Sequence, residues 1–203
     1  GTVYRTAKNG ITEPLGAGSK TDTVVKDAAP YWRLALQRQW SNHSLSAGTY
    51  GMWARIFPGG LSHGPTDRFT DIAFDAQYQY LGSKHLLSAR TTWIHEDQDW
   101  DASFPLGNTA NQTDFLNTFR INMSYFYKSQ IGRFGGSLGY FSTTGKKDSL
   151  LYSPNSVDGS RTGSPNSNGF ILEADYILNY PLWRKYNTGM IKCSLQYTIY
   201  NKF

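Results

Sequence analysis

Apolar and polar residues alternate along several segments of this chain, most clearly between residues 70 and 80. Even-numbered positions from Ile72 to Tyr80 are apolar or aromatic, whereas odd-numbered positions from Asp71 to Gln79 are Asp, Ala or Gln. Successive side chains of a β-strand point to opposite faces, so this pattern predicts a strand with one apolar and one polar face. It recurs clearly in three segments and loosely in four more, which are 118–127, 170–180 and 190–200, then 31–40, 45–57, 85–96 and 133–141. The sequence therefore predicts eight strands.

Two of the weaker segments do not separate their faces cleanly. In 31–40, Arg38 falls on the apolar face, where we expect its charged end to reach a membrane interface beside Trp40. Segment 45–57 has apolar residues at both odd and even positions. For this strand we expect an outward set formed by Tyr50, Met52, Ala54 and Ile56.

The composition decides what surrounds the apolar faces. Aromatic residues make up 15% of the chain, yet the mean hydropathy is −0.51 and long apolar runs are few. No run approaches the ~18 apolar residues of a membrane-spanning helix. A barrel in lipid needs an apolar face outside and tolerates a polar face inside. We therefore expect an all-β fold, an antiparallel transmembrane β-barrel of the porin-like, outer-membrane type, in the outer membrane of a Gram-negative bacterium.

The connections between the predicted strands alternate in length, which indicates an orientation. Short links surround residues 41–43, 82–84, 129–132 and 181–187, whereas the long ones are 58–68, 97–114 and 143–169. Outer-membrane barrels have short periplasmic turns and long external loops. Six aromatic residues would then form a girdle at the periplasmic boundary. They are Trp40, Tyr78, Tyr80, Tyr125, Tyr127 and Tyr180.

This orientation places both ends of the segment on the external side. Residues 1–30 are then expected to be an extracellular loop or extension, and residues 31–203 a single domain of eight transmembrane strands. Bacterial single-chain barrels have an even number of strands, and we take their termini to meet at the periplasmic side. We therefore expect further strands before residue 30 and after residue 203, within a larger barrel.

Several segments resemble proteobacterial outer-membrane barrel proteins whose precursors are labelled cytochrome c, of the porin–cytochrome electron-conduit type. The resembling stretches are PYWRLALQRQW, GTYGMWARIFPGG, TDRFTDIAFDAQYQYLG, WIHEDQDWDASF, SPNSNGFILEADYI and LQYTIYNKF. The resemblance implies a barrel that encloses a c-type cytochrome in electron transfer across the outer membrane. The haem-attachment motif C-x-x-C-H is absent here, so no haem is expected to be bound covalently to these residues. Any haem is expected in an upstream segment or in a partner protein.

The polar faces of the predicted strands supply the candidate lumen residues. They are Arg33, Asp71, Asp75, Arg90, Glu96, Arg120, Glu173, Asp175 and Lys192. Such residues could line an aqueous channel or contact a cytochrome, or they could be the ordinary polar lining of a barrel with charges paired across strands. The mixture of signs argues against a strongly ion-selective pore.

The sequence supports the other candidate sites less strongly. Asp97, Asp99 and Asp101 are weak candidates for Ca²⁺ ligands, because the remaining ligands of a calcium loop are missing. The four histidines, His43, His63, His85 and His95, divide between the short turns and the external side, which argues against a single four-histidine site. The loop 143–169 could fold into the lumen or bind a surface partner, although loops of this kind are commonly just exposed.

Two classes of function are not expected. No catalytic nucleophile, base and orienting group have a recognisable spacing, so the chain is not expected to be an enzyme. The net charge of +5 comes from scattered Lys and Arg residues without a basic block, so nucleic-acid binding is not expected. Beside the electron conduit, two alternatives stay open: a general diffusion porin for small hydrophilic solutes, and a structural or adhesive surface barrel.

Overall fold

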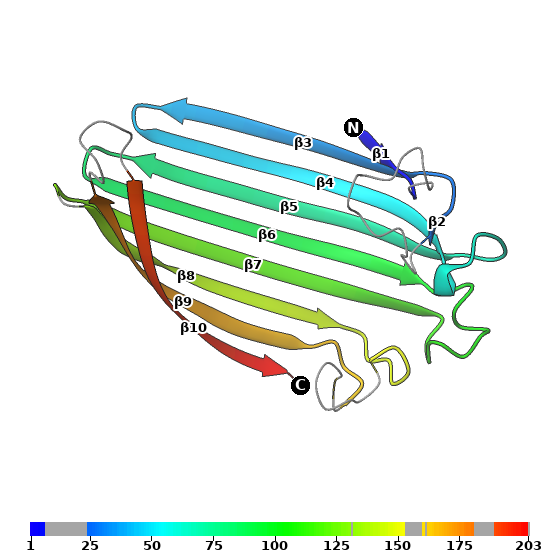
Figure 1. Cartoon of the computed structure of the whole chain (residues 1–203). Coiled ribbons are helices and arrows are strands. Elements are labelled where there is room, and N and C mark those ends of the chain that lie inside the picture. The colour runs from blue at the N-terminus through cyan, green and yellow to red at the C-terminus, as the bar shows by residue number, and fades with distance from the viewer. Residues whose placement is uncertain (7–23, 131, 153–159, 161, 181–188, 203) are drawn as a thin grey trace.

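The structure is a computed structural model that describes residues 1–6, 24–130, 132–152, 160, 162–180 and 189–202. It contains one antiparallel sheet of ten strands, and the expectation of an all-β antiparallel fold is confirmed (Figure 1). The eight long strands are β3 (Ala29–Trp40), β4 (His43–Phe57), β5 (Asp67–Leu81), β6 (His85–Asp99), β7 (Thr113–Lys128), β8 (Gly132–Gly145), β9 (Ser167–Tyr180) and β10 (Gly189–Lys202).

Two further strands are short and lie within the first thirty residues. β1 (Thr2–Tyr4) pairs with the start of β3, and β2 (Val24–Val25) pairs with the end of β4. The prediction of eight strands was therefore wrong by these two, because segments of two or three residues are too short to show alternation. A single turn of 3-10 helix, η1 (Pro58–Gly60), follows β4.

From β3 to β10 each long strand pairs with the next one along the chain. Within the described residues this order does not close on itself, so the structure is an open sheet, and the larger barrel of which these strands were expected to form a part stays a prediction. β10 forms one edge, and β3 forms the other beyond the three residues that β1 covers. No helix among the described residues has the length and apolarity needed to cross a membrane.

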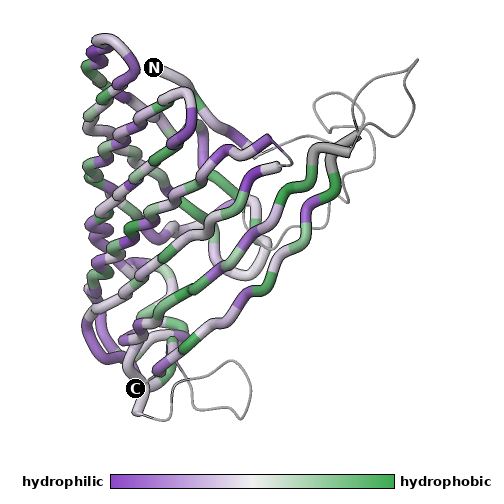
Figure 2. Tube along the Cα trace, turned by 90° about the vertical axis from the view of Figure 1, so that its left-hand side faces the viewer, coloured by the Kyte–Doolittle hydropathy of each residue, from purple (hydrophilic) through white to green (hydrophobic). Residues whose placement is uncertain are grey.

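The sheet is bent into an open trough, with β9 and β10 leaning out of the plane of the middle strands (Figures 1 and 2). Glycines in β8 allow the neighbouring backbones to come unusually close. A Cβ at Gly135 would stand 1.9 Å from the carbonyl oxygen of Tyr125 in β7, and one at Gly136 would stand 2.1 Å from that of Glu173 in β9. Any side chain at these positions would collide with backbone, so they require glycine.

The strand register separates the two faces of the sheet. Of the large hydrophobic side chains that are exposed in β3–β10, all except Leu81 and Tyr200 lie on one face, which we call the outer face. Leu34, Leu36 and Leu195 there are 66%, 79% and 76% exposed. The opposite face, which we call the polar face, carries the Asp and Gln residues of β5. Figure 2 shows the resulting alternation of hydropathy along the strands.

One expectation about the faces was wrong. Tyr50 pairs with Ala73, and Met52 pairs with Asp71, so the even-numbered residues of β4 lie on the polar face rather than the outer one. Ala54 and Ile56 follow the same register. The residues of β4 are apolar at both odd and even positions, so only pairing with the clearly alternating β5 decides which side each one takes.

Few apolar side chains are buried in this arrangement. Among the described residues the buried hydrophobic ones are four alanines, Ala29, Ala54, Ala73 and Ala102, together with Phe57 and Trp100. A sheet of this size in a water-soluble protein would bury one face against another layer. Here the outer face has no such layer over it within the described residues.

Candidate functional site: the polar face of the sheet

The register brings all nine candidate lumen residues to the polar face. Asp75 is the partner of Thr92, which is in turn the partner of Arg120, and Gln77 is the partner of Arg90. The same parity runs through the other strands and includes Arg33, Asp71, Glu96, Glu173, Asp175 and Lys192. Alternation had therefore assigned all nine to the correct side of their own strands, and pairing then places these strands side by side.

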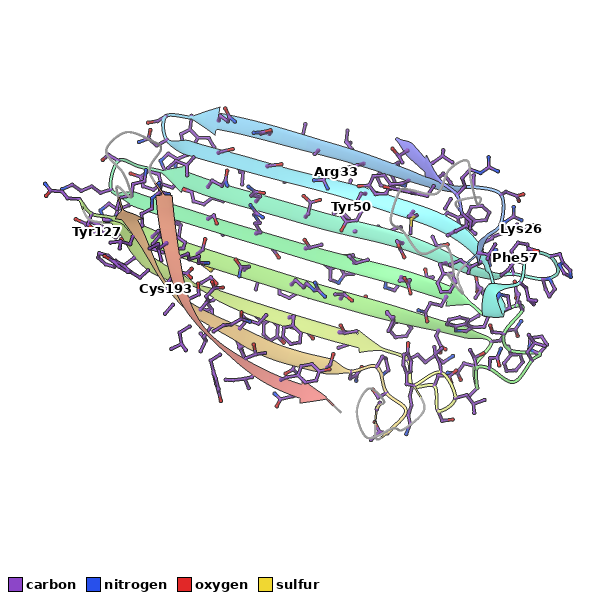
Figure 3. The ribbon with its side chains drawn as sticks, viewed as in Figure 1. Lys26, Arg33, Tyr50, Phe57, Tyr127 and Cys193 are labelled. Carbon is purple, nitrogen blue, oxygen red and sulfur yellow. The ribbon has the colours of Figure 1, made fainter. Side chains whose placement is uncertain are left out.

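Five of the nine candidate residues form ion pairs on this face. Arg33 reaches across β4 and donates a hydrogen bond to Asp75 Oδ1 at 2.8 Å. Gly48 lies between them, and a Cβ there would come within 3.3 Å of the Arg33 guanidinium, so glycine leaves the path open. The guanidinium also lies 5.6 Å from the ring centre of Tyr50. Figure 3 marks both residues on neighbouring strands.

At the other edge, Lys192 of β10 joins two acidic residues of β9. Its Nζ lies 2.9 Å from Glu173 and 3.0 Å from Asp175, and Ser194 donates a further hydrogen bond of 2.6 Å to Asp175. Asp71 and Glu96 are cross-strand partners between β5 and β6, and Glu96 also accepts a hydrogen bond from the Gln98 amide.

Arg90 and Arg120 differ from these residues. Neither makes an ion pair with any described residue, although both guanidinium groups are on exposed side chains near the middle of the polar face. The acidic side chains nearest in register are already engaged, because Asp75 binds Arg33 and Glu173 binds Lys192. The centre of the polar face therefore carries two arginines that form no ion pair with the described side chains.

Five of the six predicted girdle aromatics lie on the outer face at the short-turn ends of their strands. They are Trp40, Tyr78, Tyr80, Tyr125 and Tyr127. The side chain of the sixth, Tyr180, lies outside the described residues. Rings at this level contact one another across strands, as in the pair Tyr127–Phe134, whose centres are 5.2 Å apart.

Two histidines join this aromatic level, which sequence reasoning had missed. His43 Nδ1 and Tyr78 Oη are 2.7 Å apart, and His85 Nδ1 and Tyr125 Oη are also 2.7 Å apart, so each pair shares a hydrogen bond. His43 additionally stacks on Trp40 with ring centres 5.4 Å apart. The available signal was a repeat: each histidine opens a strand, and the next strand ends in Tyr-x-Tyr.

The three aspartates considered as Ca²⁺ ligands are not brought together. Asp97 and Asp99 lie on the outer face of β6 at its loop end, where Asp97 contacts His95 and Asp99 pairs with Arg68, while Asp101 sits in the following turn. The part of the chain that the structure describes contains no group of three or more His, Cys, Asp or Glu side chains placed to hold a metal ion.

The histidines also do not form a common site. His43 and His85 are at the short turns, His95 is on the outer face of β6, and His63 is in the connection that follows η1. Their separation agrees with the division expected from the sequence.

Three buried aspartates, Asp67, Asp114 and Asp148, bind the long connections at the end of the sheet opposite the short turns. Asp67 accepts hydrogen bonds from the backbone N–H groups of residues 102 and 103, at 2.9 Å each. Asp114 accepts from the Trp100 indole and from the Asn111 amide. Asp148 accepts from the backbone N–H groups of residues 110, 111, 150 and 151. The connection of residues 100–112 is thereby fastened to β5, to β7 and to the segment after β8.

The Asp148→Ala variant is expected to loosen the 100–112 connection by about 1 kcal/mol, because it leaves the partly buried N–H groups of residues 110 and 111 without their carboxylate acceptor. Burial raises the pKa of the Asp148 carboxyl, but the four backbone N–H groups outweigh it and hold the pKa below its usual value. A group with a depressed folded pKa stabilises above its unfolded pKa of about 3.9 and loses this contribution as pH falls through the folded value.

Cleavage by pepsin within residues 100–112 is therefore expected to stay low from pH 5 down to about pH 4 and to rise below it. The Asp148→Asn variant is the control, since its side chain keeps the shape but cannot ionise. Its cleavage should be fast already at pH 5. Equal pH profiles for the two proteins would contradict this role of Asp148.

Comparison with models of known protein families, with curated proteins and with solved structures finds no match to this chain.

Proposed function

We propose that this chain forms part of the wall of a porin-like outer-membrane β-barrel, with its outer face against lipid and its polar face lining an aqueous lumen. The observation that carries the proposal is the concentration of exposed apolar side chains on one face of the sheet. Exposed apolar patches of more than a few hundred Å² are rare on soluble monomers, whereas hydrocarbon is the natural contact of such a surface.

The dimensions of the apolar surface support this proposal. On β5 the outer residues from Ile72 to Tyr80 are apolar or aromatic, which spans about 26 Å along the strand at ~3.3 Å per residue. A tilt of roughly 40° reduces this to a height of about 20 Å, near the ~25 Å apolar band of known barrels. Beyond the band the outer face turns polar, with Arg55 paired to Asp27 and Arg68 to Asp99 at the loop ends.

The free edges of the sheet also support a barrel. β3 and β10 each present backbone N–H and C=O groups without partners among the described residues. Lipid cannot satisfy these groups, so a sheet in a bilayer needs pairing on every edge. We propose that additional strands join β10 to β3 and close the barrel.

This membrane proposal is tested on the full-length protein in its native cells. It is expected to sediment with the outer membrane and to migrate faster on a denaturing gel when unheated than when boiled, because barrels resist detergent. A protein that stays in the soluble fraction, or one whose mobility does not change on heating, would contradict the proposal.

Within this barrel class, we propose that the barrel is a sheath for a c-type cytochrome that carries electrons across the outer membrane. The sequence resemblance supports this role, and a wide polar face with paired charges suits contact with another folded protein. The full-length protein is expected to show a haem absorbance band or to co-purify with a cytochrome. Purification of the barrel without haem and without a cytochrome would contradict the proposed role in electron transfer.

A general diffusion porin is the second candidate. Arg90 and Arg120, which form no ion pair within the described part of the chain, favour it, since exposed charges suit small solutes in water. In liposomes a diffusion porin would admit small sugars without any partner. A conduit sealed by its cytochrome would not admit them. Liposome swelling before and after removal of the cytochrome therefore separates the two functions.

A further inference from the structure

The polar face contains a pocket of about 410 Å³ where β6, β7, β8 and β9 run side by side. Its polar lining comes from Arg90 and Thr92 of β6 and from Arg120 and Asn122 of β7. Arg90 is the cross-strand partner of Asn122, and Thr92 is the partner of Arg120. The two arginines are therefore diagonal neighbours, whose Cβ atoms in such a pair are about 7–8 Å apart.

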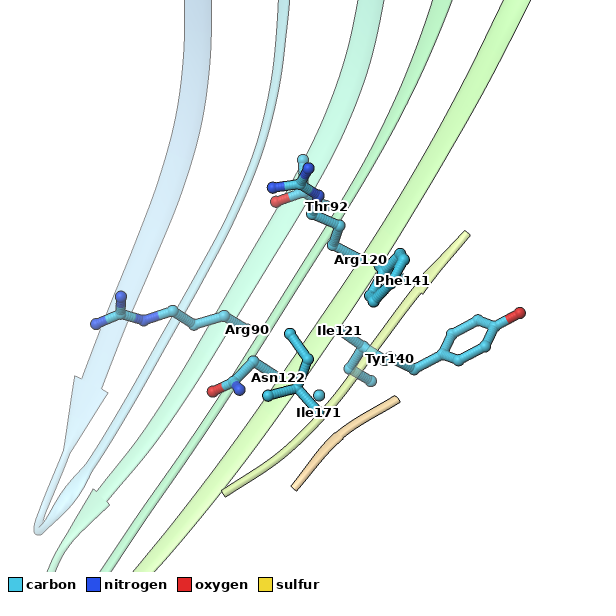
Figure 4. A pocket seen from close by; sticks show the side chains of 9 residues that line it. Arg90, Thr92, Arg120, Ile121, Asn122, Tyr140, Phe141 and Ile171 are labelled. Atoms are coloured by element: carbon cyan, nitrogen blue, oxygen red, sulfur yellow. The ribbon is translucent and has the colours of Figure 1, made fainter. Parts of the chain in front are cut away.

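The apolar lining comes from the next two strands. Phe141 of β8 is the partner of Arg120, and Ile171 of β9 is the partner of Gly139. Gly139 leaves the floor open, because a Cβ there would stand 3.4 Å from the Asn122 amide and 3.6 Å from the Ile171 Cβ. Figure 4 shows Arg90, Asn122 and Phe141 on one side of the sheet, while Tyr140 extends to the other.

We propose that this pocket binds an organic carboxylate that carries a planar apolar group, such as an aromatic acid. Guanidinium groups bind carboxylates through paired, charge-assisted hydrogen bonds, and here neither arginine has an acidic partner among the residues that the structure describes. The Asn122 amide and the Thr92 hydroxyl add neutral donors beside them. Phe141 and Ile171 then take the ring of the acid.

The distribution of charge explains why the ligand is an anion although the polar face carries both signs. Arg33 pairs with Asp75, and Lys192 lies between Glu173 and Asp175, so each of these acids is bound to a cation other than the two arginines of the pocket. The apolar wall explains why a ring is preferred over a small inorganic anion, which would leave Phe141 and Ile171 in contact with water. The inference depends on the proposed function in one respect: the proposed barrel puts the pocket beside an aqueous path.

Binding is measured on the full-length protein in detergent by titration calorimetry, with benzoate, acetate and benzylamine as probes. Benzoate is expected to bind at least about tenfold more tightly than acetate, because a buried ring adds apolar contact. Benzylamine has the same ring with a positive charge and is expected not to bind. Equal binding of benzoate and benzylamine would overturn the anion site, and equal binding of benzoate and acetate would overturn the preference for a ring.

The double variant Arg90→Gln, Arg120→Gln is expected to weaken benzoate binding by about tenfold or more, since charge-assisted hydrogen bonds are lost. Arg133→Gln is the matched control, because Arg133 is a polar-face arginine of β8 outside the pocket. It should bind benzoate as the unchanged protein does. Unchanged binding in the double variant, or an equal loss in the control, would overturn the proposal.

The heat-dependent gel mobility of each variant is recorded in parallel, so that the two proposals are judged separately. Arginine-dependent binding of benzoate by a protein without barrel behaviour would support the pocket and contradict the barrel. Barrel behaviour without arginine-dependent binding would support the proposed function and overturn this inference.

Discussion

Leu138→Arg is expected to prevent assembly of the protein in the outer membrane, whereas Ser137→Arg one residue earlier is expected to permit it. Leu138 lies on the outer face of β8, where its partners are Met123 and Leu172. Ser137 lies on the polar face, where its partners are Ser124 and Glu173. The two positions have the same depth along the strand and differ only in the direction of the side chain.

The physical reason is the cost of a charge in hydrocarbon. An arginine on the lipid face near the middle of a bilayer costs about 2–4 kcal/mol, a large fraction of the stability of a single domain. An arginine at 137 would instead meet the Glu173 carboxylate on the wet side of the sheet. A cost within about 0.5 kcal/mol is expected there.

The readout is the fraction of protein in the heat-modifiable, membrane-inserted form, together with its unfolding in urea after refolding into lipid. If both variants assemble equally well, the outer face does not contact hydrocarbon and the membrane proposal fails. If both fail equally, the position is intolerant for steric reasons. Leu138→Gln then decides, because it removes the apolar group without adding charge.

Gly135→Ala is expected to disrupt the bend of the sheet and to cost about 3 kcal/mol or more, the upper range for steric overpacking. The added Cβ would meet the Tyr125 carbonyl oxygen at 1.9 Å and the Phe126 Cα at 2.8 Å. These are backbone atoms of β7, which cannot move without breaking the pairing of β7 with β8. Movement of β8 away from β7 would break the same pairing, so the collision can be relieved only with loss of hydrogen bonds between the two strands.

Gly139→Ala is the matched control, since it lies on the same strand and its added Cβ would make only ordinary contacts of 3.4 Å or more. Its unfolding free energy is expected to change by less than about 1 kcal/mol. Denaturant unfolding of both variants in lipid measures the difference. Equal stability of the two variants would show that the close approach of β7 and β8 at Gly135 is not required.

On the polar face, strand pairing changes what the charged candidate residues imply about selectivity. Along the chain, the nine charged candidates form a mixture of signs that argues for no selectivity. In the sheet, the acids are matched with Arg33 and Lys192 or placed beside each other, while Arg90 and Arg120 are left free. The same residues therefore divide into ion pairs near the edges of the sheet, an acidic pair at Asp71 and Glu96, and two arginines near the centre, and only their neighbours across the sheet reveal this division.

The aromatic residues at the short turns show a second limit of prediction from the sequence. Tyr78 and Tyr125 were predicted to be girdle residues, but for His43 and His85 the sequence indicated only a place at the short turns. Each histidine bonds a tyrosine that is 35 or 40 residues distant in sequence. Contacts of this kind depend on strand register, and a register cannot be read from one strand alone.

The alternation of side chains by itself determined that this chain forms strands with one apolar and one polar face, because that period is a local property of an extended backbone. It also located the turns and assigned Asp75, Arg90 and Arg120 to the polar side. Only the tertiary structure decided the two short strands, the face of Tyr50 in β4, the close approach of β7 and β8 at Gly135 and the pairing of charges. These features depend on atoms that pairing brings together from distant parts of the chain, and no local pattern records which partners they meet.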